Sequence, residues 1–306
     1  IRPPSFLNGI PFKSIFFKYI FTPLTNSFMF FGSLPFSLLK IAFISPTDRP
    51  DKSTGPPSAN RSRSSSIGAV LIQSSKVPSK PFSFIDGKCV EGVHISLNDR
   101  VPILSVGSNR SPYQLKNKFT LDENLCVTPA ILYNSEIVYS ASISPYGSIP
   151  ATQWPLKGAE VILNVLWLNE RQLNIMHLTE GIGIAYNFVE LAEGSVVIEG
   201  SDYTGPVYGY VSVNGVYDFG VHAPNKILDI VSKKSLLETR SELEALCLVK
   251  DKFDPDIFDI RHWIEKVTLD KKYRMKLISK MSKKSIKPKN PPWQMISVKV
   301  DGNNMY

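Results

Sequence analysis

Cysteine is scarce in this chain of 306 residues, and its three cysteines lie far apart. They are Cys89, Cys126 and Cys247. An odd number of cysteines without close spacing predicts neither a disulfide framework nor a Cys-x-x-Cys metal site. We therefore expect buried thiols in a reducing compartment, and hence a cytoplasmic location.

The sequence also lacks the common metal and nucleotide motifs. Its four histidines show no zinc-ligand spacing, and no Gly-x-x-x-x-Gly-Lys-Ser/Thr loop is present. Gly181-Ile-Gly-Ile-Ala-Tyr186 begins like a dinucleotide-binding loop but has no third glycine. No metal or other cofactor is therefore expected. A nucleophilic role for Ser108 with a distant histidine stays open, although no Gly-x-Ser-x-Gly elbow supports it.

A continuous apolar segment that could span a membrane is missing as well. Residues 1–45 are rich in phenylalanine and residues 19–39 are uncharged, but prolines interrupt this run. Residues 46–66 are rich in proline, serine, asparagine and arginine, which predicts a disordered linker. We expect residues 1–66 to be a disordered or non-native leader and linker, with a signal or anchor as the alternative for the first part. No stable membrane span is expected.

Negative charge is absent from one segment near the C-terminus. Residues 271–289 carry nine basic and no acidic side chains, whereas residues 71–270 carry 17 basic and 24 acidic ones, a net charge of −7. The sequence predicts a basic C-terminal tail over residues 271–306, as a solvated helix end followed by a loose tail. Contact with nucleic acid or another acidic surface is the alternative, and nucleic acid is not the expected partner.

A buried strand that leads into a helix is predicted early in the globular part. Ile103, Leu104 and Val106 form a short apolar run that is typical of such a strand. Ser111 and Pro112 then fit the N-cap and the first position of a helix, and the glutamine three residues after the serine would complete a capping box.

The loop between this strand and this helix is a candidate binding site. Gly107, Ser108 and Asn109 precede the helix N-terminus, where free backbone N–H groups and the helix dipole favour an anion. A ligand carboxylate or a developing oxyanion would suit this position. A plain turn from strand to helix is the alternative.

A second capping signature predicts another helix. Asn169 and Gln172 open it, and Gly181 ends it. Glu180 is its last residue, where the negative end of the dipole disfavours a charged carboxylate, and a dry site there would suit a general acid or base. A solvated glutamate beside a C-cap glycine is the alternative. His177, on the same face, could tune this glutamate or pack in the core, and packing is favoured.

The remaining pattern predicts a β-rich domain. Strands are expected at residues 136–143, 160–167, 184–191, 196–199, 207–213 and 216–219. Asn214-Gly215, between the last two, is a strong hairpin signal. Together they predict an α+β fold with a small, mostly antiparallel β-barrel and flanking helices. One later helix is expected to open at Ser235, and a last one to run from residue 257 to about residue 281.

Three of these features together resemble the gamma-glutamyl cyclotransferase-like superfamily. That family typically shows a Tyr-Gly-Ser-Asn loop, then a helix ending in Glu-Gly, then a strand bearing an aromatic residue. This chain has Val106-Gly-Ser-Asn109, Glu180-Gly181 and Tyr186 in that order. It departs from the pattern at Val106, where the family usually has tyrosine.

The resemblance implies a pocket between the loop and the glutamate, in a domain of residues 67–270. The implied substrate-binding residues are Val106, Gly107, Ser108, Asn109 and Tyr186. Glu180 would move a proton from the α-amine of a γ-glutamyl substrate as that amine attacks the γ-carbonyl and 5-oxoproline is released. A lyase or acyltransferase of this type needs no metal or cofactor. The alternative is a non-catalytic module that binds a small ligand or a partner on the same barrel.

Overall fold

The structure is a computed structural model of the chain, which describes residues 77–119, 124–220 and 222–298. All of these residues fall within one compact unit, Arg61–Tyr306. The expected leader and linker lie outside the described residues. The domain boundaries at residues 67 and 270 stay predictions.

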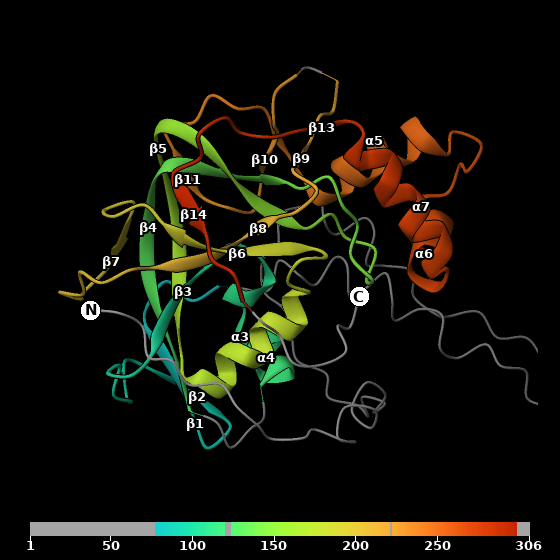
Figure 1. Cartoon of the computed structure of the whole chain (residues 1–306). Coiled ribbons are helices and arrows are strands. Elements are labelled where there is room, and N and C mark those ends of the chain that lie inside the picture. The colour runs from blue at the N-terminus through green and yellow to red at the C-terminus, as the bar shows by residue number, and fades with distance from the viewer. Residues whose placement is uncertain (1–76, 120–123, 221, 299–306) are drawn as a thin grey trace, which may run out of the picture. The chain divides into compact units, whose positions relative to one another are not determined.

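The large sheet is built around one long antiparallel hairpin (Figure 1). Its strands are β4, Leu125–Tyr139, and β5, Ala151–Leu168. They pair along most of their length, with a register shift between Tyr133 and Ser135. The strand expected at residues 160–167 lies within the longer β5. The strand expected at residues 136–143 overlaps only the end of β4, which stops at Tyr139.

The other strands of this twelve-stranded sheet are β1 (Phe82–Ile85), β2 (Lys88–Glu91), β3 (Val101–Ser105), β6 (Tyr186–Leu191), β7 (Val196–Ile198), β8 (Tyr208–Ser212), β10 (Lys226–Ile227), β11 (Ser232–Lys233), β12 (Thr239–Arg240) and β14 (Trp293–Met295). The main order is β12-β10-β4-β5-β3-β8-β6-β14, and β1, β2, β7 and β11 pair beside this path. A two-stranded sheet joins β9 (Val216–Tyr217) to β13 (Ser285–Ile286).

Most of these pairs are antiparallel, and the parallel ones are β3 with β8 and β10 with β12. The predicted α+β class with a mostly antiparallel sheet is therefore confirmed. Among the described residues the main path ends at β12 and β14, which do not pair with each other. Closure into a barrel stays a prediction.

The hairpin expected at Asn214-Gly215 is wrong. Gly215 does form a turn, with φ of 77°, and its N–H donates to the Ser212 carbonyl at 3.3 Å. The strands on its two sides nevertheless separate, because β8 pairs with β6 whereas β9 pairs with β13. The Gly215 carbonyl accepts the N–H of Ala141 at 2.9 Å, and a Cβ on Gly215 would lie 2.8 Å from the Ile286 carbonyl oxygen. Long-range pairing has overridden the local turn signal.

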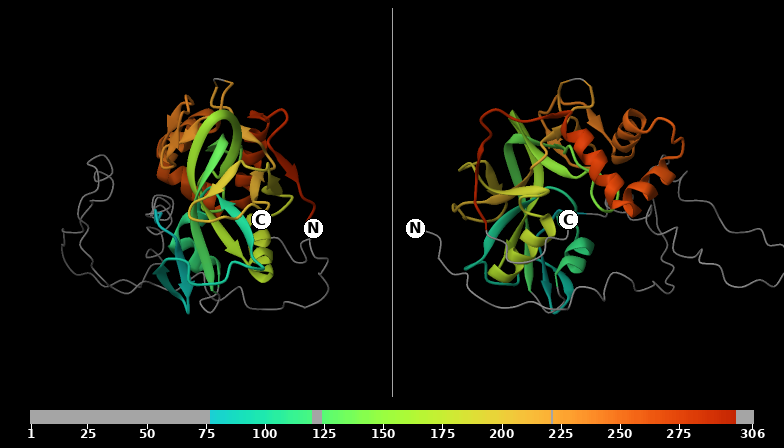
Figure 2. Two further views of the ribbon diagram at one scale, coloured as in Figure 1. Left: turned by 90° about the vertical axis from the view of Figure 1, so that its left-hand side faces the viewer. Right: turned by 45° about the vertical axis from the view of Figure 1, so that its right-hand side comes forward.

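The described helices are the 3-10 turn η1 (Ser108–Arg110), α3 (Pro112–Lys118), α4 (Glu170–Glu180), α5 (Glu242–Phe253), α6 (Ile260–Leu269) and α7 (Lys271–Ser282). In Figures 1 and 2, α5, α6 and α7 lie together, apart from α3 and α4. Within the described residues, no helix combines the length and the apolar character needed to cross a membrane.

Three features of the expected helices are wrong. The helix expected from Ser235 begins instead after Ser241, which forms a complete capping box. The single helix expected over residues 257–281 is two helices, because Asp270 ends α6 and caps α7 by accepting the Tyr273 N–H at 2.9 Å. At the start of α3 the N-cap serine makes no side-chain cap hydrogen bond.

Three clusters of buried apolar side chains hold these elements together. The first lies within the large sheet and includes Val106. The second joins α3 and α4 to the sheet through Leu115, Met176 and Phe188. The third packs α5, α6 and α7 around Tyr139 at the end of β4. The C-terminal helices therefore share their core with the central hairpin.

The described part of the basic segment is folded. Leu277 and Met281 of α7 are 2% and 0% exposed and belong to the third cluster. Further along, β14 adds a strand to β6. The sequence predicts a solvated helix end and a loose tail here, but one face of α7 is apolar enough to pack on the rest of the unit.

Candidate functional site

The structure brings the predicted glutamate to the end of a well-capped helix. Asn169 Oδ1 accepts the Gln172 N–H at 2.8 Å, and Gln172 Oε1 accepts the Asn169 N–H at 3.1 Å. This is the predicted capping box. At the other end Gly181 has φ of 60°, and its N–H donates to the Leu178 carbonyl at 3.2 Å. The position of Glu180, the last residue of α4, is thus fixed from both ends of the helix.

The predicted loop and the predicted glutamate meet. Asn109 lies in η1, and its Nδ2 donates to Glu180 Oε1 at 2.9 Å. The next residue holds η1 in place, because Arg110 donates from Nε to Asn164 Oδ1 and from Nη2 to the Ile162 carbonyl, both at 3.3 Å. Burial lowers the pKa of Arg110 to about 10. The loop is therefore a short 3-10 turn anchored on β5.

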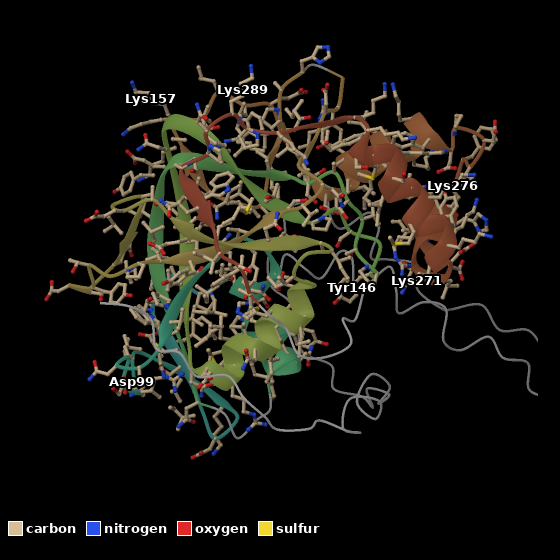
Figure 3. The ribbon with its side chains drawn as sticks, in the orientation of Figure 1. Asp99, Tyr146, Lys157, Lys271, Lys276 and Lys289 are labelled. Atoms are coloured by element: carbon tan, nitrogen blue, oxygen red, sulfur yellow. The ribbon has the colours of Figure 1, made fainter. Side chains whose placement is uncertain are left out.

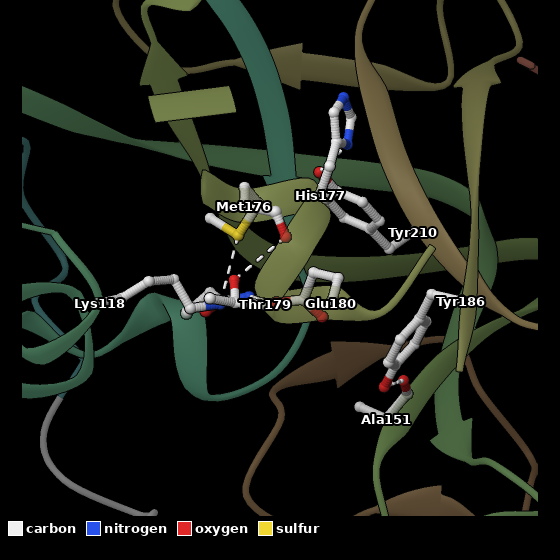
Figure 4. A network of polar contacts seen from close by, with 9 residues as sticks. Lys118, Ala151, Met176, His177, Thr179, Glu180, Tyr186 and Tyr210 are labelled. Carbon is white, nitrogen blue, oxygen red and sulfur yellow. Dashed lines mark hydrogen bonds and ion pairs between the residues drawn. The ribbon is translucent and has the colours of Figure 1, made fainter. Parts of the chain in front are cut away.

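A lysine that the motifs did not indicate also reaches the glutamate. Lys118 Nζ donates to Glu180 Oε1 at 2.7 Å and to Met176 Sδ at 3.3 Å. The Lys118 and Glu180 side chains are only 15% and 12% exposed. Figure 4 shows Lys118 extending toward Met176 and Glu180. The unfavourable helix end predicted for a charged glutamate is therefore balanced by a nearby ammonium group.

His177 packs behind Glu180 as a neutral group. Its Nδ1 lies 2.9 Å from the Tyr210 hydroxyl oxygen, and its ring meets that of Phe188 edge to face. Burial lowers the pKa of His177 to about 4, against the opposing charge of Glu180. Burial, and then the charge of Glu180, raise the pKa of Tyr210 well above its ordinary value. At neutral pH, His177 and Tyr210 behind Glu180 are therefore uncharged.

Two of the other predicted binding residues, Gly107 and Tyr186, lie beside one alanine. The Tyr186 hydroxyl donates to the Ala151 carbonyl at 3.0 Å, as Figure 4 shows. A Cβ on Gly107 would lie 3.7 Å from the Ala151 Cβ, so the loop passes beside the same residue. Val106 is 9% exposed and packs within the first buried cluster. Ser108 begins η1. The binding and catalytic roles of all these residues stay predictions.

Tyr146, on the loop between β4 and β5, is a second residue that sequence reasoning missed. It is 55% exposed, yet burial around its hydroxyl and then the negative charge of Glu180 raise its pKa. Figure 3 labels this residue. The available signal was an aromatic residue flanked by proline and glycine in the turn.

The loop that carries Tyr146 is held by the C-terminal helices. Its Ile149 N–H donates to Glu242 Oε1 of α5 at 2.6 Å. Gly147 has φ of 85°, and a Cβ there would lie 2.9 Å from the Ile264 Cγ2 atom of α6. Only glycine suits both the backbone conformation and this close approach. Helices α5 and α6 therefore hold this loop in its conformation.

Metal ligation is not indicated by the described part of the chain, where no group of three histidine, cysteine, aspartate or glutamate side chains could hold an ion. The candidate site instead offers the carboxylate of Glu180, the ammonium of Lys118, the amide of Asn109 and nearby hydroxyl groups.

Comparison with known proteins yields structural neighbours only. No protein-family model matches the chain, and no curated protein does. One neighbour is an Arabidopsis thaliana protein solved in solution, 23% identical, covering 38% of this chain and 63% of its own, with a TM-score of 0.28. The matched part thus spans less than two thirds of that protein.

Two further neighbours are matched over nearly their whole length. A gamma-glutamyl cyclotransferase is 13% identical, with 59% of this chain and 99% of that chain covered and a TM-score of 0.31. An uncharacterized Homo sapiens protein is 12% identical, with 60% and 99% covered and a TM-score of 0.32. The neighbours thus include a gamma-glutamyl cyclotransferase, the family that the sequence motifs resemble. These TM-scores are too low to carry a functional argument.

Proposed function

We propose that this chain is a cyclotransferase-type enzyme that releases 5-oxoproline from a γ-glutamyl amide, with Glu180 as its acid and base. The observation that supports this most is the hydrogen bond from Asn109 Nδ2 to Glu180 Oε1 at 2.9 Å, which joins the loop to the glutamate. The substrate would lie beside this hydrogen bond, in the pocket of the small antiparallel barrel that the motif resemblance implies.

In the proposed reaction the Glu180 carboxylate takes a proton from the α-ammonium group of the substrate. The freed amine attacks the γ-carbonyl carbon, and the new C–N bond closes the ring of 5-oxoproline. Glu180 then returns its proton to the leaving nitrogen as the original amide C–N bond breaks. The second proton of the ring nitrogen passes to the released amine, which departs as an ammonium ion. Backbone N–H groups of residues 107–109 would stabilise the oxyanion that forms in between.

The contacts of Glu180 distinguish its two carboxylate oxygens. The bonds from Asn109 and Lys118 both fall on Glu180 Oε1. We therefore assign the proton transfer to Oε2. The Lys118 ammonium balances the negative charge of the carboxylate.

A non-catalytic binding module is the second candidate. The Lys118–Glu180 ion pair favours it, because a carboxylate that is already paired can serve as a fixed structural group. The Lys118 ammonium could then hold the carboxylate of a small ligand by exchanging partners.

The deciding experiment measures 5-oxoproline release by the full chain from a panel of γ-glutamyl amino acids and γ-glutamyl amines. Glu180→Gln should lose about a hundredfold or more of the turnover, because the amide cannot shuttle a proton. Glu170→Gln is the matched control, since this exposed glutamate begins the same helix and should keep full turnover. Release that survives in Glu180→Gln would refute the assigned role.

The same samples separate the two candidates. If folded wild-type protein releases no 5-oxoproline from any donor, binding of the same γ-glutamyl compounds is measured by calorimetry. Saturable binding that persists in Glu180→Gln but is lost on changing Lys118 to methionine would establish the binding module instead.

A further inference from the structure

The exposed face of α7 carries several closely spaced positive charges. Its exposed lysines, together with the two that follow the helix, are Lys271, Lys272, Lys276, Lys280, Lys283 and Lys284. We call this set the lysine face. Lys272, Lys276 and Lys280 follow one another at four-residue spacing, so they project from neighbouring turns of one side. Figure 3 labels Lys271 and Lys276 on this helix.

The lysine face is held rigidly. The opposite side of α7 is buried through Leu277 and Met281. Arg274 turns inward, where its Nη1 donates to the Val267 carbonyl at 2.7 Å and to the Thr268 carbonyl at 3.0 Å. The lysines therefore stand on a fixed surface, which lowers the entropic cost of binding a partner.

The segment that carries these lysines has no acidic residue of its own. Residues 271–289 contain no aspartate or glutamate. Among the ion pairs formed within the described residues, none involves a lysine of this face. Residues 71–270 carry 17 basic and 24 acidic side chains, so the rest of the unit is negative. A negatively charged surface would therefore attract this face more strongly than the remainder of the unit, which favours one orientation of approach.

Apolar side chains lie exposed beside the lysines. Leu269 and Met275 are 77% and 48% exposed, and Met275 stands between Lys271, Lys272 and Lys276 around the helix. Exposed apolar groups gain nothing from the phosphates of a duplex, but they gain from the acyl boundary of a lipid layer. Arg274 is the one arginine of residues 271–289, and it points away from solvent. Its guanidinium group is therefore not available for paired hydrogen bonds to phosphates or bases.

We propose that the lysine face of α7 binds the surface of a membrane that contains anionic lipids, with Leu269 and Met275 entering its interface. Lysines attract the negative headgroups of such a surface additively over a short range. The two apolar side chains add a contact that salt does not screen. This peripheral contact is independent of the reaction proposed for Glu180.

The experiment uses the full chain and sedimentation with phosphatidylcholine vesicles that contain or lack phosphatidylserine. Binding is expected only with phosphatidylserine, and it should weaken as ionic strength rises. Changing four lysines of the face to glutamine together, at positions 272, 276, 280 and 283, should lower the partition coefficient by about a hundredfold. The matched control removes the same charge from exposed lysines elsewhere, as Lys88→Gln, Lys116→Gln, Lys157→Gln and Lys252→Gln. The partition coefficient of this control variant should fall by about twofold at most.

A second variant distinguishes the membrane from nucleic acid. The double change Leu269→Gln and Met275→Gln leaves every charge in place and alters only exposed side chains. It should weaken vesicle binding and leave binding to duplex DNA unchanged. Failure to bind phosphatidylserine vesicles would overturn the proposal, and so would an equal loss in the control variant. Tighter binding to duplex DNA, lost with the four lysines and indifferent to Leu269 and Met275, would overturn it in favour of nucleic acid.

Discussion

Glu242 is expected to make the folded state less stable as the pH rises. It is the first residue of α5, and its Oε1 accepts the Ile149 N–H at 2.6 Å. Burial raises the pKa of Glu242 from 4.5 to about 8, opposed by the Ile149 hydrogen bond and assisted by the charge of Asp229. The unfolded chain therefore releases this proton first. Stability contributed by the protonated carboxyl is complete below about pH 4.5 and is lost as the pH climbs toward 8.

The size of the effect follows from the two pKa values. One pKa unit corresponds to about 1.4 kcal/mol. Between about pH 5 and about pH 8, the unfolded carboxyl ionises while the buried one largely keeps its proton, which costs about 3 kcal/mol of unfolding free energy. This is an upper value, because Glu242 is partly exposed and water screens part of the cost.

Glu242→Gln removes the titration and keeps an acceptor oxygen for Ile149. The variant should gain stability over wild type by about 3 kcal/mol between about pH 5 and about pH 8. Urea unfolding, followed through the fluorescence of tryptophans that include the fully buried Trp263, measures this difference.

The matched control lies two residues further along the same helix. Hydrogen bonds from Ser241 lower the pKa of the exposed Glu244, so Glu244→Gln should lose its small stabilising effect above the unfolded pKa and show the opposite trend. A stability difference between Glu242→Gln and wild type that is equal at about pH 5 and about pH 8 would refute the reasoning.

Three further substitutions test the site and the core. Lys118→Met should lower the unfolding free energy by about 2 kcal/mol, between the values for exposed and buried ion pairs, and by less in a Glu180→Gln background. Tyr146→Phe should reduce 5-oxoproline release while changing stability by about 0.5 kcal/mol or less. Gln153 is 2% exposed and its amide has no hydrogen-bond partner among the described residues, so Gln153→Met should stabilise by about 1 kcal/mol. Urea melts and product assays measure these effects.

Local signals were the part of the fold that the sequence could predict. The capping box at Asn169 and Gln172 and the C-cap at Gly181 formed as expected, because each needs only neighbours within one helix. The Asn214-Gly215 hairpin failed for the opposite reason. Its strands had other partners far along the chain, and no local pattern reports that competition.

The candidate site shows the same division. The loop at Asn109 and the glutamate at position 180 could be selected from their motifs, and the structure joins them by a hydrogen bond. Lys118 lies 62 residues from Glu180 in the sequence, and their contact depends on how α3 packs beside α4. A lysine near a helix C-terminus is ordinary on dipole grounds, so nothing in its local sequence marks it as a partner of the glutamate.

The C-terminal helices give the loop beside the site its conformation. α5 holds Ile149 through Glu242, and α6 closes on Gly147, where a side chain would collide with Ile264. Tyr146 directly precedes Gly147 in this loop, and burial, followed by the charge of Glu180, raises the pKa of its hydroxyl. Since α5, α6 and α7 share one buried cluster with the end of β4, a shift of α7 can reach this loop through packed side chains. The basic helix and the loop that carries Tyr146 are thus joined through packed side chains.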